Sequence, residues 1–526
     1  MVANYNSQDT RNEEKRLAMR RNYGIWTLSI TALLTAALSG LAQDTRTVTE
    51  PVLPPACTTL LAEKTGDSEK LAEIFEKTTD TARIQAALNA CKPGMAVELT
   101  ASGKLNAFLS GSLDMKEGVT LLIDKGVTLY GSRDPKDYDQ NPSGDGQLLC
   151  GTLSDVGAPY ITAADAAKGG GAPQRPMMPP PMRGRPCKSL ITVNVKNAAI
   201  MGDGVIDGRG GAQLIGHDYT WWQMARAAEP KQLRYFSVKL ITASHADGFI
   251  LYRITLHNSP NYHVTVSNTD GFTAWGVHLL TPTVRGTDAR NTDGIDPGSS
   301  TNITVANSWI DNGDDNIAIK TGVTHMSVFN NHFYTGHGMS IGSETFSGDS
   351  FLLVAGLTEE NTTSGIRIKS NAARGGPVHD LTYENICMKN VSIPIAISPF
   401  YNNGTVEGFV DPGVVGDRIP DYKGITLRNI VSLTPGDVLI AGKDETHVTE
   451  ITLDTVTIKG IKPEQVHSQY TKAAVAHVNF DLKGTGVVVT QAPPLPAIDR
   501  AQGASLIAVD PLTKLGQCVG AFPPMQ

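Results

Sequence analysis

Residues 300–313, STNITVANSWIDNG, and residues 323–336, VTHMSVFNNHFYTG, share one construction. In each segment, apolar residues alternate with polar ones over two short runs, and a turn separates the runs. An alternation with a period of two is typical of strands that bury one face. Each segment therefore predicts a strand, a turn and a second strand.

Segments of this kind recur from residue 189 to residue 460. Those that begin at residues 246, 269, 300 and 323 start 23, 31 and 23 residues apart. This spacing is too short for propeller blades, and the segments are too rich in strands for helical repeats. The sequence therefore predicts an all-β fold, a right-handed single-stranded parallel β-helix in which each segment forms one coil. A β-sandwich or barrel is the alternative.

The N-terminal residues are typical of an export signal. Basic residues precede an apolar run at residues 25–42, which ends in SGLA with small residues suited to cleavage after Ala42. The sequence predicts a signal peptide at residues 1–42, a flexible tether at 43–56 and a β-helix domain at 57–526. An uncleaved membrane anchor is the alternative, although the run is short and broken by Ser and Thr. We expect a secreted or periplasmic protein that is monomeric and has no stable membrane association after cleavage.

Two segments of the β-helix domain do not fit the strand pattern. Residues 80–91, DTARIQAALNAC, place apolar residues at helical spacing after Asp80, a residue suited to the N-cap. This helix is expected to cap the N-terminal end of the β-helix, which otherwise exposes unpaired backbone groups. Residues 166–186 are rich in Gly and Pro and are expected to form an exposed loop. A weaker helical pattern lies at residues 221–228.

The charge and the cysteines narrow the possible partners. Lys and Arg number 45 against 52 Asp and Glu, and the net charge of −7 argues against nucleic-acid binding, which needs a basic face. None of the six cysteines forms a C-x-x-C pair, so the sequence predicts no zinc site. In an exported chain they can form up to three disulfides. Cys57 and Cys91 are close along the chain, as are Cys150 and Cys187, but the sequence leaves the connectivity open.

Three carboxylates recur at the repeat spacing. NTDGID places Asp293 21 residues before Asp314, which stands next to Asp315 in IDNGDDNIAIK (residues 310–320). Carried backwards from the apolar residues of IAIK, the alternation points Asp314 outward and Asp315 into the core. A buried, unpaired carboxylate is strongly unfavourable or becomes neutral. Either the chain bends at Gly313 and exposes both side chains, or one carboxyl is held in an unusual state.

A histidine and two cations follow on the next coils. His337, in TGHGMSIGSE, lies 22 residues after Asp315, and SGIRIKS places Arg367 and Lys369 about one longer coil further on. The isoleucines of SGIRIKS face inward, so the two cations share the outward face. Taken singly, each of these residues is typical of a turn or a solvated surface. Because residues one repeat apart stack in a solenoid, their shared period predicts one cluster on one outer strip.

Such a cluster suits the cleavage of a glycosidic bond. One carboxylic acid must protonate the leaving oxygen while a carboxylate activates water. Packing carboxylates together raises the pKa of one of them and keeps a proton available. An arginine and a lysine alongside can hold a negatively charged sugar, the arginine through its bidentate match to a carboxylate. The residues therefore predict acid/base hydrolysis without a metal or another cofactor.

The motifs NTDGID, GDD, GHG and RIK, in this order and at this spacing, resemble those of the polygalacturonases, glycoside hydrolase family 28. The resemblance covers about residues 75–460 and includes GVIDGRGG (204–211), NSPNYHV (258–264) and GGPVHDLTYENI (375–386). It implies a pectin-lyase-like β-helix and a catalytic domain at residues 57–526. It also implies hydrolysis of the α-1,4 bonds of polygalacturonan in pectin, with inversion, and this polymer as the partner.

The resemblance gives each candidate catalytic residue a role by its position in the motifs. Asp314 matches the general acid. Asp293 and Asp315 match the pair that activates water. His337 matches a residue that supports protonation of the acid.

Three further residues match substrate binders of the family. Arg367 and Lys369 match the residues that hold the substrate carboxylate, and Tyr401, in IAISPFYN, matches a tyrosine at the cleft. The alternatives left open are a hydrolase of rhamnogalacturonan or xylogalacturonan, a calcium-dependent pectate lyase, and a non-catalytic carbohydrate-binding β-helix. Cleavage inside the polymer or at its end also stays open.

Overall fold

The computed structural model describes most of the chain. The predicted signal peptide (1–42) and residues 166–185 of the Gly/Pro-rich segment lie outside the described residues. In the described part, no helix is long and apolar enough to cross a membrane. The described residues are 43–66, 76–140, 144, 146–154, 186–228, 234–281, 289–402, 411–495, 518 and 520–525.

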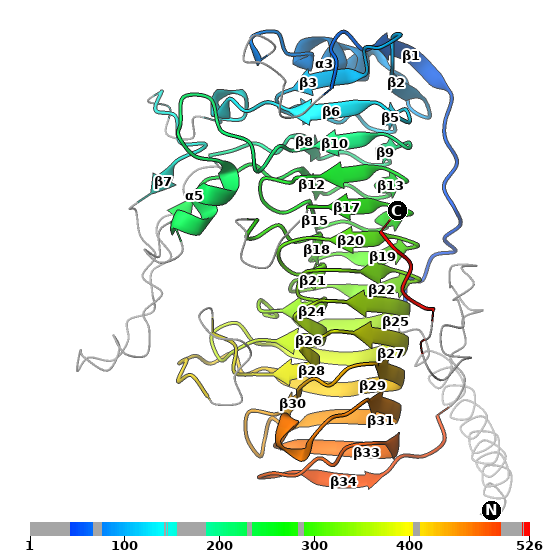
Figure 1. The fold of residues 1–526 in the computed structure, drawn as a ribbon, viewed down its shortest axis with the longest axis vertical. Coiled ribbons are helices and arrows are strands. Elements are labelled where there is room, and N and C mark those ends of the chain that lie inside the picture. The colour runs from blue at the N-terminus through cyan, green and yellow to red at the C-terminus, as the bar shows by residue number, and fades with distance from the viewer. Residues whose placement is uncertain are drawn as a thin grey trace, which may run out of the picture.

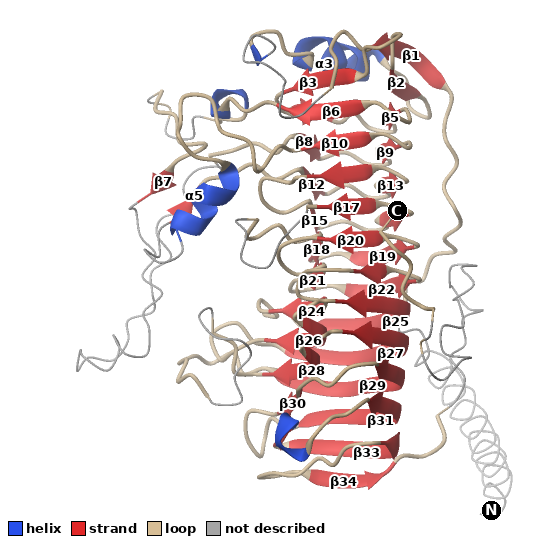
Figure 2. Ribbon diagram, in the orientation of Figure 1, coloured by secondary structure: helices blue, strands red, loops and turns tan. Residues whose placement is uncertain are grey.

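Parallel strands stacked coil upon coil make up the structure, as Figures 1 and 2 show. The predicted all-β parallel β-helix is confirmed. Among the described residues, one sheet has 11 strands and a second, which turns around the stack, has 21. The strands of the 11-stranded sheet are β4 (Leu113–Asp114), β8 (Ile191–Val193), β12 (Ile241–Ser244), β15 (Val264–Ser267), β18 (Ile295–Gly298), β21 (Ile317–Ile319), β24 (Met339–Gly342), β26 (Ser364–Lys369), β28 (Ile393–Ser398), β30 (Val438–Ala441) and β32 (Val466–Gln469).

The larger sheet supplies the other sides of each coil. Its strands pair in parallel with those of the neighbouring coils. They are β1 (Ala56–Leu61), β2 (Ala96–Thr100), β3 (Ala107–Ser110), β5 (Thr120–Ile123), β6 (Thr128–Gly131), β9 (Ala199–Met201), β10 (Val205–Asp207), β13 (Ile250–Tyr252), β14 (Thr255–His257), β16 (Thr273–Trp275), β17 (His278–Leu280), β19 (Thr301–Ala306), β20 (Trp309–Asp311), β22 (Thr324–Phe329), β23 (His332–Phe333), β25 (Asp349–Glu360), β27 (Pro377–Lys389), β29 (Asp421–Ser432), β31 (Thr449–Ile458), β33 (Thr471–Val478) and β34 (Val488–Gln491).

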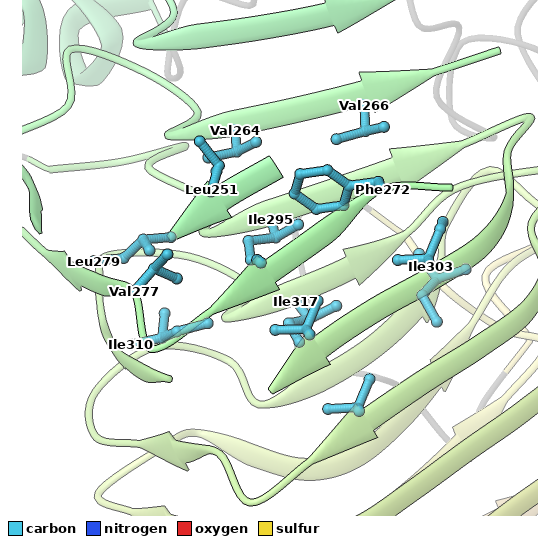
Figure 3. Close-up of a cluster of buried hydrophobic side chains, with 14 of the residues drawn as sticks. Leu251, Val264, Val266, Phe272, Val277, Leu279, Ile295, Ile303, Ile310 and Ile317 are labelled. Carbon is cyan, nitrogen blue, oxygen red and sulfur yellow. The ribbon is translucent and has the colours of Figure 1, made fainter. Parts of the chain in front are cut away.

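Apolar ladders along the inside of the coils hold the stack together. In the 11-stranded sheet, the register places Ile295 beside Ile317, Ile317 beside Met339, and Met339 beside Ile366. These side chains are fully buried, and Figure 3 shows Ile295 and Ile317 among the apolar side chains of neighbouring strands. Burial of one such side chain contributes about 1.5–3 kcal/mol. The inward half of each alternating segment therefore supplies the core, and the outward half is available for chemistry.

Helix α3 (Thr81–Ala90) covers the N-terminal coil, as predicted, and buries Ile84 and Leu88. Asp80 stands at its N-cap position, but its side chain makes no capping hydrogen bond. The Asp80 carboxylate instead accepts from the backbone N–H of Leu109 (2.8 Å) and from the Lys64 ammonium (3.0 Å). Asp80 therefore ties the helix to the first coils.

The weaker helical pattern also forms a helix, α5 (Trp221–Ala228). It belongs to an excursion from the coils that lies beside the upper part of the stack in Figure 1. The same excursion contains an antiparallel pair of short strands, β7 (Leu153–Ser154) and β11 (Arg234–Tyr235). Short 3-10 turns complete the list at Pro135–Asp137 and Pro463–Gln465.

The expected flexible tether at residues 43–56 is instead attached to the outside of the coils. The backbone N–H of Asp44 donates to the Ser327 hydroxyl (3.0 Å), and the Asp44 carboxylate accepts from the Thr304 hydroxyl (2.7 Å). Val48, in the same segment, is also buried. Figure 1 shows the segment running from β1 along the side of the stack. The prediction of a tether was wrong because these partners lie far away in sequence.

Within the described residues, three disulfides join the six cysteines. Two of them join cysteines that are close along the chain, Cys57–Cys91 and Cys150–Cys187, which settles a connectivity that the sequence left open. The third disulfide joins Cys387 in β27 to Cys518, 131 residues later. It fastens the C-terminal residues 520–525 near the same coils, where the Tyr334 hydroxyl donates to the carbonyl of Pro523 (2.8 Å).

Asp349→Asn is expected to stabilise the fold above neutral pH. One oxygen of Asp349 accepts from the N–H of Val323 (3.0 Å), and burial raises the pKa of this carboxyl from 3.8 to about 7. The native state therefore keeps a proton that the unfolded chain releases above pH 3.8, and this stabilising contribution is lost as the pH rises through 7. Asparagine stays neutral, so we expect equal stability near pH 4 and a gain of about 2–4 kcal/mol at pH 8.

Urea unfolding of the wild type and Asp349→Asn at the two pH values measures this difference. Asp203→Asn, which changes an exposed carboxylate paired with Arg253, serves as the control. An Asp349→Asn effect of the same size at both pH values would contradict the expectation.

Candidate active site

The structure brings all of the predicted site residues to neighbouring coils of the 11-stranded sheet. The strands concerned, β18, β21, β24, β26 and β28, follow one another in this sheet (Figure 1). Backbone hydrogen bonds link the coils at the site, from the N–H of Gly294 to the carbonyl of Asp315 and from the N–H of His337 to the carbonyl of Asp314, both 2.9 Å. The site residues are Asp293 before β18, Asp314 and Asp315 before β21, His337 before β24, Arg367 and Lys369 in β26, and Tyr401 after β28.

Asp315 is held between two cations. Its Oδ1 lies 2.6 Å from Nη1 of Arg367, and its Oδ2 lies 2.8 Å from Nζ of Lys369. The side chain of Asp315 is 1% exposed, and those of Arg367 and Lys369 are 10% and 6% exposed. Burial alone raises the pKa of Asp315, but the charges of Lys369 and Arg367 outweigh it and lower the pKa to about 2. Asp315 is therefore an ionised carboxylate with both oxygens occupied.

Asp315 does not point into the core, because β21 begins only at Ile317 and the backbone bends at residues 313, 314 and 316. A side chain at Gly313 would place its Cβ 2.0 Å from the carbonyl oxygen of Ala289, so only glycine permits this approach. The alternation of β21 therefore does not extend back to Asp315, and Asp315 reaches the outward-facing Arg367 and Lys369. The unusual state anticipated for a buried carboxylate is thus an ion pair.

Asp314 is the most accessible of the three predicted catalytic carboxylates, with 19% of its side chain exposed. Its Oδ1 lies 3.1 Å from Nδ1 of His337 and accepts from the backbone N–H of Asp315 (3.0 Å). Its Oδ2 accepts from Nδ2 of Asn291 (3.3 Å). Burial raises the pKa of Asp314, but the charge and hydrogen bond of His337, together with the charges of Lys369 and Arg367, outweigh this effect and hold the pKa below its ordinary value.

Asp293 and a carboxylate that the sequence analysis missed, Asp296, are fully buried nearby. Burial, followed by the charges of Asp296 and Asp314, raises the pKa of Asp293 well above its ordinary value. Burial likewise raises the pKa of Asp296 to about 7. Oδ1 of Asp293 and both oxygens of Asp296 have no hydrogen-bond partner among the described residues. The crowding of carboxylates does raise a pKa, as predicted, but at Asp293 and Asp296 rather than at Asp314.

Lys320, also missed from the sequence, balances these buried carboxyls. Burial lowers the pKa of Lys320, but the charges of Asp296 and Asp293 outweigh it and raise the pKa above its ordinary value. Its Nζ donates to the carbonyl of Gly342 (3.2 Å). Both missed residues stand inside motifs already singled out, Asp296 in NTDGID and Lys320 in IAIK. Each follows an isoleucine that faces the core, so the alternation places its side chain on the outer face. This pattern could have identified both residues from the sequence.

His263, in NSPNYHV, supports the backbone of Asp293. Its Nδ1 lies 3.1 Å from the carbonyl oxygen of Thr292 and 3.0 Å from that of Asp293, and its Nε2 lies 2.8 Å from the Thr281 hydroxyl. Burial lowers the pKa of His263 to about 4, so the ring is neutral at neutral pH. The neutral ring can donate from Nδ1 and accept at Nε2, which matches these partners.

Tyr401 lies at the cation side of the site. Its ring centroid is 5.3 Å from Nζ of Lys369, and its backbone N–H donates to the carbonyl of Ser370 (2.9 Å). Burial raises the pKa of Tyr401 to about 12, so the hydroxyl keeps its proton. A neutral phenol beside a buried ammonium can face a sugar while the cation faces its carboxylate.

One group of described residues has the spacing of metal ligands. Asp314, Asp315 and His337 each offer one ligand atom, and these atoms lie within 4.8 Å of one another. Arg367 and Lys369 already occupy both oxygens of Asp315. Their positive charges repel a cation at this position. The donor set therefore fits a divalent ion poorly.

Comparisons with known proteins agree with this geometry. Residues 183–477 match the family model described as Glycosyl hydrolases family 28. The chain belongs to this family. The family 28 chain is 37% identical over 454 residues to the endo-polygalacturonase of Pectobacterium parmentieri, across 85% of this chain and 98% of the relative. It is 35% identical over 513 residues to the polygalacturonase of Ralstonia solanacearum, across 88% and 91% of the two chains.

A solved structure shows that the family 28 chain is also similar to a polygalacturonase in its three-dimensional fold. The polygalacturonase from Erwinia carotovora ssp. carotovora superposes with a TM-score of 0.66 and 37% identity, covering 84% of this chain and 100% of that one. Membership of the family identifies the chain as a glycosidase and confirms the prediction of an enzyme. Carboxyl groups gathered in one cluster are the groups that glycoside hydrolysis uses.

Proposed function

We propose that this family 28 enzyme hydrolyses the α-1,4 bonds of polygalacturonan. The observation that carries the proposal is the nearly buried pair of Arg367 and Lys369 beside the carboxylates. These two cations share the single carboxylate of Asp315, so the pair can bind a second anion, and a sugar carboxylate is the anion that a uronate polymer brings. The relatives that cover most of this chain are polygalacturonases by name, which supports the same substrate.

The accessible carboxyl, Asp314, acts as the general acid. Its proton passes to the glycosidic oxygen as the bond to the sugar carbon breaks. Asp293 and Asp315 hold a water molecule whose oxygen attacks that carbon, and one of them takes the released proton. The attack occurs in a single displacement and inverts the configuration at the sugar carbon.

Substrate binding is expected to move the proton to the acid. In the free enzyme, the raised pKa lies at Asp293 and the lowered pKa at Asp314, whose anion is favoured by His337, Lys369 and Arg367. A uronate bound to the two cations partly neutralises them, so the pKa of Asp314 rises. One proton then moves from Asp293 to Asp314. Asp293 becomes a carboxylate that can act as a base, and Asp314 becomes a carboxylic acid that can donate the proton.

Export of the enzyme is part of this proposal. Residues 1–42 act as a signal peptide that is removed after Ala42, and the mature enzyme is a secreted or periplasmic monomer. The three disulfides support this location, because disulfides persist in oxidising compartments. Residues 57–526 then form the catalytic domain.

Product analysis on defined galacturonate oligomers tests the proposal. We expect hydrolysis to saturated oligomers, with internal bonds cut first, because relatives at 37% identity are endo-polygalacturonases by name. Nuclear magnetic resonance of the first product gives the configuration at the new reducing end. Cleavage of rhamnogalacturonan or xylogalacturonan in preference to the plain polymer would overturn the substrate.

The same incubations with excess chelator separate hydrolysis from elimination. We expect full activity in the chelator, because Arg367 and Lys369 occupy the position where a divalent ion would bind Asp315. We also expect no unsaturated product. Loss of activity in chelator together with ultraviolet-absorbing products would instead identify a calcium-dependent lyase.

A further inference from the structure

A chain of hydrogen bonds reaches the Asp314 carboxylate from outside the coils. Nδ2 of Asn261 donates to the Tyr235 hydroxyl (3.0 Å), and this hydroxyl donates to Oδ1 of Asn291 (2.9 Å). Nδ2 of Asn291 then donates to Oδ2 of Asp314 (3.3 Å). The chain ends on the oxygen that does not face His337.

Chemistry fixes the direction of every bond in this chain. The amide nitrogen of Asn261 can only donate, so the Tyr235 oxygen accepts there. Tyr235 has one proton, and it points to the carbonyl oxygen of Asn291. That contact turns the amide so that its NH₂ group faces Asp314. With the amide reversed, a carbonyl oxygen would face the carboxylate and repel it.

The excursion beside the coils delivers the Tyr235 hydroxyl. Tyr235 lies in β11, which pairs with β7, and the N–H of Phe236 donates to the carbonyl of Thr152 (3.1 Å). Cys150, three residues before β7, forms a disulfide with Cys187 and so fixes the chain that leads into β7. The backbone of the excursion is thus held without help from the hydroxyl. Burial raises the pKa of Tyr235 above its ordinary value, so the proton stays on the phenol.

The two oxygens of Asp314 are therefore restrained from two sides. Oδ1 is held by His337 and by the N–H of Asp315, and Oδ2 is held by Asn291. A carboxyl restrained at both oxygens keeps its plane fixed, and a general acid needs such fixed geometry toward the leaving oxygen.

We propose that Tyr235 is a positioning residue for the reaction, acting through Asn291 to orient the Asp314 carboxyl. This inference rests on the proposed role of Asp314 as the general acid. It assigns a catalytic task to the excursion that carries α5, β7 and β11, which the motifs of the coils do not reveal.

Tyr235→Phe tests the inference, because it removes the hydroxyl and keeps the ring. We expect kcat on a galacturonate oligomer to fall about tenfold, with KM changed by less than about twofold, since the lost hydrogen bond acts on the acid and not on substrate binding. Tyr219→Phe is the matched control. It removes a hydroxyl of the same excursion that donates to the carbonyl of Gly151 (2.8 Å) and does not touch the chain.

A double-mutant cycle with Asn291→Ala separates positioning from general support. If Tyr235 acts through Asn291, the second change adds almost nothing to the first. Thermal unfolding midpoints of all variants confirm that each folds. Unchanged kcat in Tyr235→Phe, an equal loss in Tyr219→Phe, or additive losses in the cycle would each overturn the inference. A wild-type enzyme that leaves galacturonate oligomers intact would overturn the proposed function instead.

Discussion

Asp314→Asn should lower kcat on galacturonate oligomers by about 10²–10⁴-fold, the usual contribution of a general acid. Asparagine has the same shape and still accepts through Oδ1 from the N–H of Asp315, so the site is expected to stay folded. It has no acidic proton to give to the glycosidic oxygen. Binding of an oligomer, measured by calorimetry, is expected to remain within a few-fold of the wild type, because the cations that hold the uronate are untouched.

Asp203→Asn is the matched control for the loss of a carboxylate. Asp203 lies between β9 and β10 and pairs with Arg253 in an exposed position. We expect this variant to turn over like the wild type. Asp314→Asn with undiminished turnover would remove Asp314 from the role of acid.

Lys369→Met should have the second largest effect, on activity and on stability together. The change takes one of two cations from the buried Asp315 carboxylate and one from the bound uronate. We expect kcat/KM to fall by about 10²–10³-fold, the effect of truncating a buried charge pair. We also expect the free energy of unfolding to fall by about 1–3 kcal/mol, because Arg367 still holds the other oxygen of Asp315.

Lys188→Met is the control for the loss of a paired ammonium, because Lys188 lies before β8 and away from the site. Lys188 pairs with Asp114 at 2.5 Å, but both side chains are partly exposed, so its loss is expected to change stability by less than about 1 kcal/mol. Steady-state kinetics and urea unfolding measure both variants. If Lys369→Met matched Lys188→Met in both measurements, the cation pair would have no part in substrate binding.

The repeat in the sequence predicted the fold and the location of the site for the same reason. Segments that repeat at a regular spacing fold into coils that stack on one another. Asp293, Asp314 and His337 lie one coil apart in sequence and are therefore neighbours in space. The inward isoleucines of SGIRIKS placed Arg367 and Lys369 on the outer face, and both lie there. Local alternation was sufficient for these residues because each stands in or next to a regular strand.

Where the chain leaves the regular strand, the same reasoning failed. The bends at residues 313, 314 and 316 changed the direction expected for Asp315, and Gly313 lies there against the carbonyl of Ala289, on another part of the chain. The pKa values of the site carboxyls also could not be predicted from the sequence. Which carboxyl gains a proton depends on how far the buried cations stand from each one, and Arg367 and Lys369 meet Asp315 rather than Asp293.

The attachment of the N-terminal segment has a consequence for the order in which the chain folds. Asp44 bonds to Thr304 and Ser327, which follow it by 260 and 283 residues. During synthesis the N-terminal residues emerge first. They can form these hydrogen bonds only after the coils that contain β19 and β22 have folded. Closing so long a loop is slow and entropically unfavourable, and only a finished surface can compensate for it. The docking of residues 43–50 should therefore be a late event, and shortening the chain from this end should loosen completed coils rather than prevent their assembly.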